Sequence, residues 1–272
     1  MTAAITLDSV GLTYSDHPIL EDVSLSLQEG EVLSLLGPSG SGKTSVLRIV
    51  LGFVPPSRGS VWVASRLASG DGRVRTPPEE RHLAVVFQDL ALWPHLTVFG
   101  QLAFGLESRG VPGRERGVRI EAMLKRVGLA GRERSYPGEL SGGEKQRVAI
   151  ARALVLEPRA VLLDEPLSNL DVDLKRELLS LFRELLRERS TTALYVTHDL
   201  REAAALGDRI AVMEEGRIVQ DGTWTSSGLA LPTTSSGRWS TTSSGPGTGG
   251  HPTPDDPSRG TCRSAPQHTP RV

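Results

Sequence analysis

The hydrophobic and polar positions up to about residue 222 follow two alternating periods. Short apolar, β-branched runs alternate with stretches in which apolar residues recur at helical spacing, and Gly, Pro, Asn or Asp separates them. Three runs, Val32–Leu36, Val161–Leu163 and Ala193–Val196, are apolar almost throughout, as in strands covered on both faces. This alternation predicts an α/β fold with a mostly parallel core sheet.

A strand pair and a block of helices extend this core. The runs Ile5–Ser9 and Val23–Leu27 have the pattern of hairpin strands and predict an antiparallel β layer. Residues from about 89 to 157 are mainly helical in pattern, which predicts a helical subdomain inserted into the α/β core. Helix starts are expected near Lys43, Ser141, Val172 and Asp199.

The composition changes abruptly after Asp221-Gly222-Thr223. Ser, Thr, Gly and Pro dominate residues 224 to 272, and few aliphatic side chains remain there. Such a segment buries too little apolar surface to offset the entropy of ordering it. We therefore predict one domain over residues 1–223, a disordered tail over 224–272, and no strand after Trp224.

Charge and cysteine content exclude several classes of function. Lys and Arg (31) nearly balance Asp and Glu (32), so the net charge of −1 gives no positive field for nucleic acid. A single cysteine, Cys262, excludes an internal disulfide and fits a reducing compartment. Met1–Val10 lacks the pattern of a secretory signal, and no apolar run approaches the roughly 20 residues of a membrane-spanning helix. We expect a cytoplasmic protein.

A glycine-rich motif follows the strand at 32–36 and opens a helical pattern. It consists of Gly37, Pro38, Ser39, Gly40, Ser41, Gly42, Lys43 and Thr44, with Ser45 next. This is a P-loop in its required context, where backbone N–H groups and a helix N-terminus face phosphate oxygens. Lys43 would neutralise β- and γ-phosphate charge, and Thr44 would bind Mg²⁺ through its hydroxyl. The complete match disfavours the alternative of an ordinary glycine-rich turn.

Two adjacent carboxylates end the apolar strand within Ala160–Pro166. Ligands of open α/β sheets bind at the carboxyl ends of the strands. Asp164 is suited to contact Mg²⁺, and Glu165 is suited to polarise an attacking water as general base. A solvated acidic turn would have the same local sequence, but the P-loop in the same chain favours the catalytic interpretation.

A third motif points to a particular family of P-loop proteins. The segment LSGGEKQR at residues 140–147 resembles the signature motif of ATP-binding cassette (ABC) proteins, and the similarity extends over about residues 3 to 223. The resemblance implies a P-loop NTPase cassette that hydrolyses ATP with Mg²⁺ and pairs head to tail with a second cassette. Ser141, Gly142 and Gly143 would then face a γ-phosphate bound to the partner. From the residues alone, a Ser N-cap with a flexible approach fits equally well.

Other positions gain a role only through this resemblance. Tyr14 is similar to the aromatic that stacks on adenine, although a tyrosine near a hairpin is more often packed in a core. Gln88 resembles the glutamine that senses Mg²⁺ and the attacking water. Asp171 ends a Ser168–Asp171 segment similar to the family's D-loop, in which Asn169 departs from the commoner Ala. His198 resembles the switch histidine that contacts the γ-phosphate; out of context it would be a local hydrogen-bonding residue.

The resemblance also implies partners. Residues Leu90–Val98 are similar to the region that receives a permease helix in importers for ferric iron, polyamines, sulfate, molybdate or maltose-like sugars, although Trp93 departs from the commoner Phe or Tyr. A place in the subdomain core is the alternative for these residues. We therefore expect an ATPase at the cytoplasmic face of the membrane, with a second cassette, permease subunits and a solute-binding protein as partners.

Two further interpretations stay open at this point. A non-transport ABC protein that clamps a ribosome or DNA is the second candidate, and a scaffold that binds ATP without turnover is the third. Importers of the resembling subgroup usually continue into a β-barrel domain after the position of Asp221–Thr223, and no such pattern follows here. The chain is therefore either a short member or the product of a changed reading frame near its end.

Overall fold

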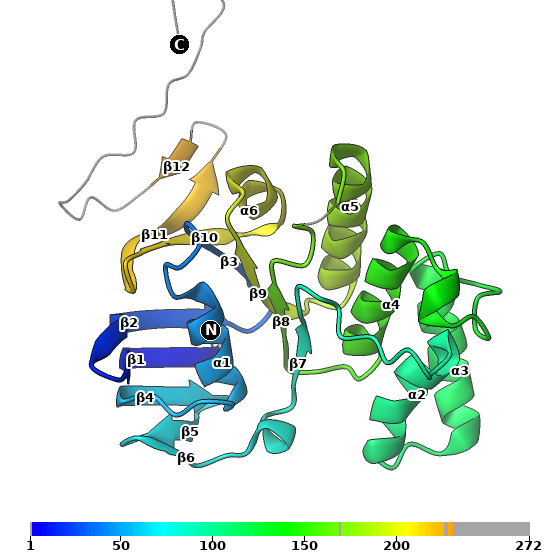
Figure 1. The fold of residues 1–272 in the computed structure, drawn as a ribbon, viewed down its shortest axis with the longest axis horizontal. Helices are drawn as coiled ribbons and strands as arrows, with labels where there is room; N and C mark the ends of the chain where they lie inside the picture. The colour runs from blue at the N-terminus through cyan, green and yellow to red at the C-terminus, as the bar shows by residue number, and fades with distance from the viewer. Residues whose placement is uncertain (1, 169, 226–227, 231–272) are drawn as a thin grey trace, which may run out of the picture. The chain divides into compact units, whose positions relative to one another are not determined.

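The computed structural model describes residues 2–168, 170–225 and 228–230. The chain divides into two units, Met1–Ser235 and Ser236–Val272, and all the described residues belong to the first. Two sheets organise this unit (Figure 1).

The larger sheet has strand order β12-β11-β10-β3-β9-β8-β7. Its five parallel strands are β3 (Val32–Leu36), β7 (Leu83–Val86), β8 (Ala160–Asp164), β9 (Thr192–Thr197) and β10 (Arg209–Glu214). The antiparallel strands β11 (Arg217–Thr225) and β12 (Gly228–Ala230) extend one edge. Both β3 and β9 are buried on both faces, which confirms the mostly parallel core sheet.

The smaller sheet is antiparallel, with order β2-β1-β4-β5-β6. Its strands are β1 (Ala3–Tyr14), β2 (His17–Gln28), β4 (Arg58–Val63), β5 (Arg66–Gly70) and β6 (Arg73–Val74). Ser15 and Asp16 join β1 to β2 with φ of 45° and 69°, the left-handed pair of a tight hairpin turn. The predicted hairpin is confirmed, and its strands are longer than the apolar pattern indicated.

Alternate residues of the core strands face two separate cores. Leu33, Leu162 and Leu194 pack with the antiparallel sheet and with α1 (Lys43–Leu51). Val161 and Tyr195 pack on the opposite face with helices α2 (Val98–Ser108), α3 (Gly113–Arg126), α4 (Gly142–Leu154) and α5 (Val172–Glu188). The period of two along each strand thus places one helix between the two sheets and the remaining long helices on the other side (Figure 1).

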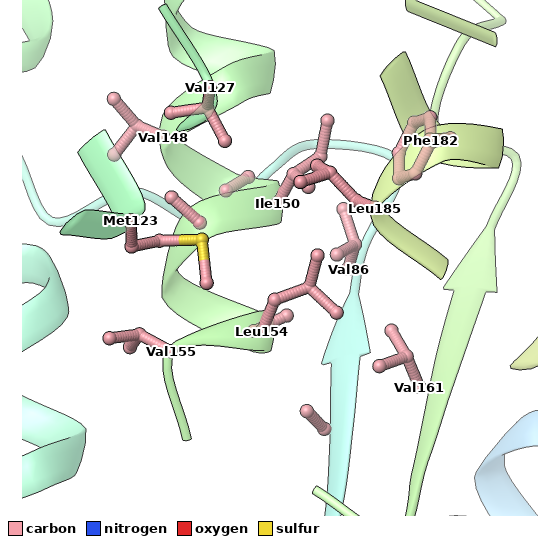
Figure 2. Packing of buried hydrophobic residues seen from close by; sticks show 14 of the residues in the cluster. Val86, Met123, Val127, Val148, Ile150, Leu154, Val155, Val161, Phe182 and Leu185 are labelled. Atoms are coloured by element: carbon pink, nitrogen blue, oxygen red, sulfur yellow. The ribbon is translucent and has the colours of Figure 1, made fainter. Parts of the chain in front are cut away.

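The inserted helical subdomain joins the main sheet through α4. Figure 2 shows Ile150 and Leu154 of α4 facing Val86 of β7 and Leu185 of α5, while Val148 packs towards Val127. The 3₁₀ turns η1 (Pro78–Arg81) and η2 (Pro137–Glu139) and the short helix α6 (Leu200–Leu206) complete the described elements. Helices begin at or within a residue of the four predicted starts.

The structure corrects the expected end of the folded part. Strand β11 continues through Thr225, and residues 228–230 form β12, which pairs with Thr223 and Trp224. The prediction of no strand after Trp224 is therefore wrong, because a short edge strand needs only backbone pairing and leaves little apolar pattern to recognise. Residues 231–272, including Cys262, lie outside the described residues. Among the described helices, none is long and apolar enough to cross a membrane.

Candidate functional site

The P-loop backbone is shaped by its glycines and by β10. Residue 37 must be Gly, since a Cβ there would lie 2.2 Å from the Met213 carbonyl oxygen. Gly40 and Gly42 have φ of 82° and 104°, which L side chains rarely adopt. Gly42 caps α1 without a side-chain hydrogen bond, so the first N–H groups of the helix stay available to an anion.

Lys43 lies inside this loop and is 4% exposed. Its ammonium donates hydrogen bonds to the carbonyl oxygens of Gly37 (2.9 Å) and Pro38 (2.8 Å). The same nitrogen is 3.6 Å from Oε1 of Glu165. Next to it, the buried Ser41 hydroxyl has no hydrogen-bond partner within the described protein. A fixed cation, an unpaired hydroxyl and free helix N–H groups together form a cradle that fits phosphate oxygens.

Thr44 and Asp164 bring two oxygens together at the edge of the cradle. The Thr44 hydroxyl donates to Oδ1 of Asp164 at 3.2 Å. Burial raises the pKa of Asp164, and the charge of Glu165 adds to that rise, whereas the Thr44 hydrogen bond opposes it. Within the described residues, no group of three or more His, Cys, Asp or Glu could hold a metal. One hydroxyl and one carboxylate fit Mg²⁺, which takes one or two carboxylates and completes its shell with water and phosphate.

Glu165 and His198 form a pair beside Lys43. Glu165 directly follows β8 with a φ of 44°, and its N–H donates to the Val196 carbonyl oxygen at 3.0 Å. One carboxylate oxygen faces Lys43, and the other lies 2.8 Å from Nδ1 of His198. Because His198 follows β9 and β9 lies next to β8, the parallel sheet itself brings the two side chains together. A carboxylate fixed on both oxygens in a partly open position can orient and deprotonate a water.

Gln88 and Tyr14 lie at the margins of this cluster. Gln88 is two residues after Val86, which pairs with Leu163, so it lies at the same sheet edge as Asp164 and Glu165. Tyr14 is 46% exposed at the hairpin tip, which contradicts the alternative that it packs in a core. Within the part of the chain that the structure describes, no hydrogen bond or ion pair joins the Tyr14 or Gln88 side chain to the cluster.

The signature segment forms a second helix N-terminus, away from the first. Ser141 caps α4: its hydroxyl accepts from Glu144 N–H at 3.2 Å, and the Glu144 carboxylate accepts from Ser141 N–H at 2.8 Å. These Ser141 bonds lower the pKa of Glu144. Ser141 and Gly142 are exposed, and Gly143 is buried against Leu174. The hydrogen bonds and ion pairs of the described chain do not connect Ser141–Gly143 to Lys43, Asp164 or Glu165.

Asp171 has a clear local role. Its carboxylate accepts from Leu174 N–H at 2.9 Å and caps α5. Asn169, the departure from the D-loop pattern, lies outside the described residues.

Several polar residues near the site were missed in the sequence. The buried Gln146 donates from its amide to the Pro166 carbonyl oxygen and so ties α4 to the turn after Glu165. Thr197 and Glu202 are also buried, on β9 and α6 beside His198. A polar residue among apolar neighbours at helical spacing is the one signal that could have found Gln146, and Glu202 carries no such signal.

The segment Leu90–Val98 is fastened to the helical subdomain. Arg152 donates to the carbonyl oxygens of Leu90 (2.7 Å) and Ala91 (2.6 Å), and Gln101 donates to that of Trp93 (2.6 Å). The Trp93 ring is half-buried, 4.9 Å from the ring of Phe104, with the Arg152 guanidinium 5.0 Å from its centroid. Phe104 itself is 54% exposed, so the segment continues into an exposed aromatic surface.

Comparisons with known proteins agree with this geometry. The ABC transporter family model matches residues 20–168, more than half of the chain. The chain is 46% identical over 219 residues to an Fe(3+) ions import ATP-binding protein of Rhizobium etli, and 48% identical over 217 residues to a spermidine/putrescine import ATP-binding protein of Rubrobacter xylanophilus. These alignments cover 80% of this chain, but 61% and 56% of the relatives, so the chain spans little more than half the length of these relatives.

Two solved structures share the fold. The CbiO1 protein of Clostridium perfringens, part of an ABC transporter complex, superposes with a TM-score of 0.75 at 30% identity, covering 82% of this chain and 89% of that one. The ATP-binding cassette MJ0796, in a dimeric post-hydrolysis state with ADP and phosphate, gives a TM-score of 0.70 at 32% identity, covering 80% and 98%. With the family model matching more than half of its residues, this chain belongs to the ABC transporter family.

Proposed function

We propose that this chain hydrolyses ATP and energises the import of a solute through separate membrane subunits. The observation that carries the proposal is the cluster in which Lys43, Asp164 and Glu165 meet at the carboxyl ends of parallel strands. It combines a phosphate cradle, a metal-binding edge and a candidate general base, which are the parts that phosphoryl transfer to water requires.

The proposed chemistry assigns one task to each side chain. Lys43 and the N–H groups of α1 hold the β- and γ-phosphates of ATP, with Ser39 and Ser41 in the loop and Ser45 in the first turn of α1. Thr44 and Asp164 would hold Mg²⁺, with Gln88 close by, and the cation would neutralise charge on the phosphate oxygens. Glu165 takes a proton from the attacking water, and His198 keeps the carboxylate aimed at that water. Tyr14 would stack on adenine from the hairpin tip.

The second half of the site would come from another copy of the chain. The α4 N-terminus is exposed, its Glu144 carboxylate is engaged by Ser141 and Arg132, and it offers N–H groups to an anion. A head-to-tail dimer would place Ser141–Gly143 over the partner's γ-phosphate and bring Asp171 near the dimer contact. The related cassette MJ0796, a dimer with ADP and phosphate bound, supports such an arrangement. Loss of the γ-phosphate would then weaken the closed dimer.

The names of the relatives support the proposed import. Their names include import of Fe(3+), spermidine/putrescine and, as a putative activity, 2-aminoethylphosphonate. We infer a similar importer here, attached to the cytoplasmic face of the membrane, in which permease subunits contact the surface around Leu90–Val98 and Phe104 and a solute-binding protein supplies the solute. A clamp on ribosome or DNA is disfavoured, because none of these names describes one.

The test is a reconstitution. The full chain would be purified with the permease encoded beside its gene and placed in liposomes, and phosphate release and solute uptake would be measured together. Uptake that requires Mg-ATP supports the proposal. Absence of phosphate release would contradict it, and co-purification with ribosomes instead of a permease would favour the clamp.

A further inference from the structure

A buried carboxylate lies directly behind His198. Glu202 of α6 is 4% exposed, and both of its oxygens accept hydrogen bonds. Oε2 accepts from the Tyr195 hydroxyl at 2.9 Å and from the Thr197 hydroxyl at 2.8 Å, and Oε1 is 3.1 Å from the Lys175 ammonium. Burying a carboxylate is costly unless such donors surround it, so this arrangement is specific.

Thr197 connects this carboxylate to the segment that carries His198. Its hydroxyl accepts from Asp199 N–H at 3.0 Å and donates its own proton to Oε2 of Glu202, because a carboxylate can only accept. Its carbonyl oxygen accepts from Gly37 N–H of the P-loop at 3.3 Å. Thr197 and Asp199, the two neighbours of His198, are thus both held by the Thr197 hydroxyl, while the His198 ring faces Glu165.

Glu202 also joins this segment to α5. Lys175 lies in the first turn of α5, and its N–H donates to the Asp171 carbonyl oxygen at 3.0 Å. Burial, and then the charge of Glu202, raise the pKa of Tyr195 well above its usual value, so this phenol stays a donor to Glu202. The hydrogen bonds and ion pairs of Glu202 within the described chain reach neither Lys43 nor Glu165, so its influence on the site must pass through Tyr195, Thr197 or Lys175.

We infer that Glu202 is a positioning residue for His198, because it holds the turn after β9 through Thr197. Its ion pair with Lys175 attaches that turn to α5 and contributes to stability. The inference rests on the proposed ATP hydrolysis for its kinetic consequence, but the geometry that it describes does not. Displacing His198, which orients the proposed base Glu165, should reduce turnover. ATP binding should not weaken, because Lys43 and the P-loop are unchanged.

The chain offers a matched pair of variants. In Glu202→Gln, the amide oxygen can still accept from Tyr195 and Thr197, but the amide NH₂ then faces the Lys175 ammonium, donor against donor. Adding Lys175→Met removes that conflict and leaves the two hydroxyl bonds intact. Thr197→Val removes the hydroxyl that links Glu202 to the His198 turn, and Glu121→Gln on the exposed face of α3 serves as control.

Steady-state kinetics of the full chain with Mg-ATP is the first measurement. Glu202→Gln and Thr197→Val should lower kcat on the order of 10- to 100-fold with KM for ATP within about twofold of wild type. Glu202→Gln/Lys175→Met should recover most of the lost kcat, although it lacks the Lys175 contact and should unfold at a lower temperature than wild type. If Glu202 served only the stability of the fold, the double variant, which lacks the Lys175 contact, would recover no kcat. Wild-type kcat in Glu202→Gln, or no recovery in the double variant, overturns the inference.

NMR of the histidine rings tests the geometry without turnover. The His198 signal, assigned by its loss in His198→Gln, should move in Glu202→Gln and Thr197→Val and return towards the wild-type position in the double variant. An unmoved His198 signal in both single variants overturns the inference. If wild-type protein releases no phosphate while the signal behaves as expected, the proposed hydrolysis fails and the positioning role of Glu202 stands.

Discussion

Two helix N-termini of this chain look alike in sequence and differ in their surroundings. Both α1 and α4 begin in Gly- and Ser-rich segments that expose backbone N–H groups. At α1, Gly42 provides no side-chain cap, and Lys43 and Thr44 reach the carboxylates that end β8. At α4, Ser141 and Glu144 satisfy each other in a capping box.

The N-terminus of α1 is surrounded by charged groups from other elements, whereas the N-terminus of α4 mainly exposes its own backbone. The α1 end gathers its chemical groups from β8 and β9, which the parallel sheet places beside it. The α4 end gathers Arg132, which pairs with Glu144, and its cap holds the first turn in shape. The α1 end carries the groups that could hold and hydrolyse a triphosphate, whereas the α4 end carries exposed N–H groups and a carboxylate, Glu144, that is already paired. Two chains that exchange these surfaces would combine them, and the substitutions below test this comparison.

Removing the base should have the largest effect. Glu165→Gln keeps the size of the side chain and can still face Lys43, but it cannot take a proton from water. We expect kcat to fall about 10²- to 10⁴-fold, with ATP still bound. Phosphate release and ATP binding would be measured on the same preparation, with Glu157→Gln as control. Turnover near the wild-type rate would remove Glu165 from its assigned role.

Removing the cation should chiefly affect binding. Lys43→Ala deletes the ammonium that faces Gly37, Pro38 and Glu165, so the Kd for Mg-ATP should rise by about 100-fold, equivalent to roughly 3 kcal/mol for a charge-assisted hydrogen-bond donor. Isothermal titration would measure it against Lys125→Ala, on the exposed face of α3. An unchanged Kd would mean that the α1 end does not hold the triphosphate.

The α1 side of this comparison could be predicted from the sequence, and the reason is physical. Strands buried on both faces leave continuous apolar runs, and a P-loop requires glycines at fixed places, so β3, β8 and the cradle were visible as local patterns. Helix starts near Ser141, Val172 and Asp199 were visible for a similar reason, since a cap bonds within three residues of itself.

Features that depend on distant contacts were not visible. Arg81 is 2% exposed and donates to carbonyl oxygens of α1 and β5, and burial lowers its pKa to about 10, yet in sequence it is one more charge in a polar stretch. Glu202 likewise looks like an exposed helical residue until α6 packs between β9 and α5. Strands β4 to β6 carry mixed, half-exposed patterns that give no clear period. Long-range packing decided each of these cases.

Placing a charge on the α4 end tests the exchange of surfaces. A Cβ on Gly142 meets nothing within 4 Å, so Gly142→Asp should fold and bind ATP normally. In a head-to-tail dimer the new carboxylate would meet the partner's γ-phosphate, and this repulsion should lower turnover at least about 10-fold. Gly138→Asp, at an equally open position on η2, is the matched control. Equal turnover in the two variants would mean that α4 contacts no phosphate.

Mixing two inactive variants sharpens the same test. When Lys43→Ala and Gly142→Asp chains pair, both defects fall in one site and the other site is intact. Random pairing should therefore restore up to roughly a quarter of wild-type turnover, if the two sites act independently. No recovery in the mixture, while mixed dimers are detected by their tags, would contradict a site shared between chains.

The smallest expected effect is on thermal stability, and it comes from the unfavourable burial of the Asp164 charge. Burial raises the pKa of this carboxyl in the folded chain, so the folded state binds its proton more tightly than the unfolded chain does. Stability should therefore fall as the pH rises from the pKa of the unfolded chain to the higher pKa of the folded chain. Asp164→Asn keeps an acceptor for Thr44 without the charge, and should raise Tm at pH 8 by no more than about 4 °C, the shift that 1 kcal/mol gives in a domain of this size. The difference should shrink as pH falls and Asp164 takes up its proton. Thermal melts between pH 8 and pH 4.5, compared with Asp8→Asn on the exposed face of β1, would measure it; a gain in Tm that is the same at every pH would mean that the buried charge is not its cause.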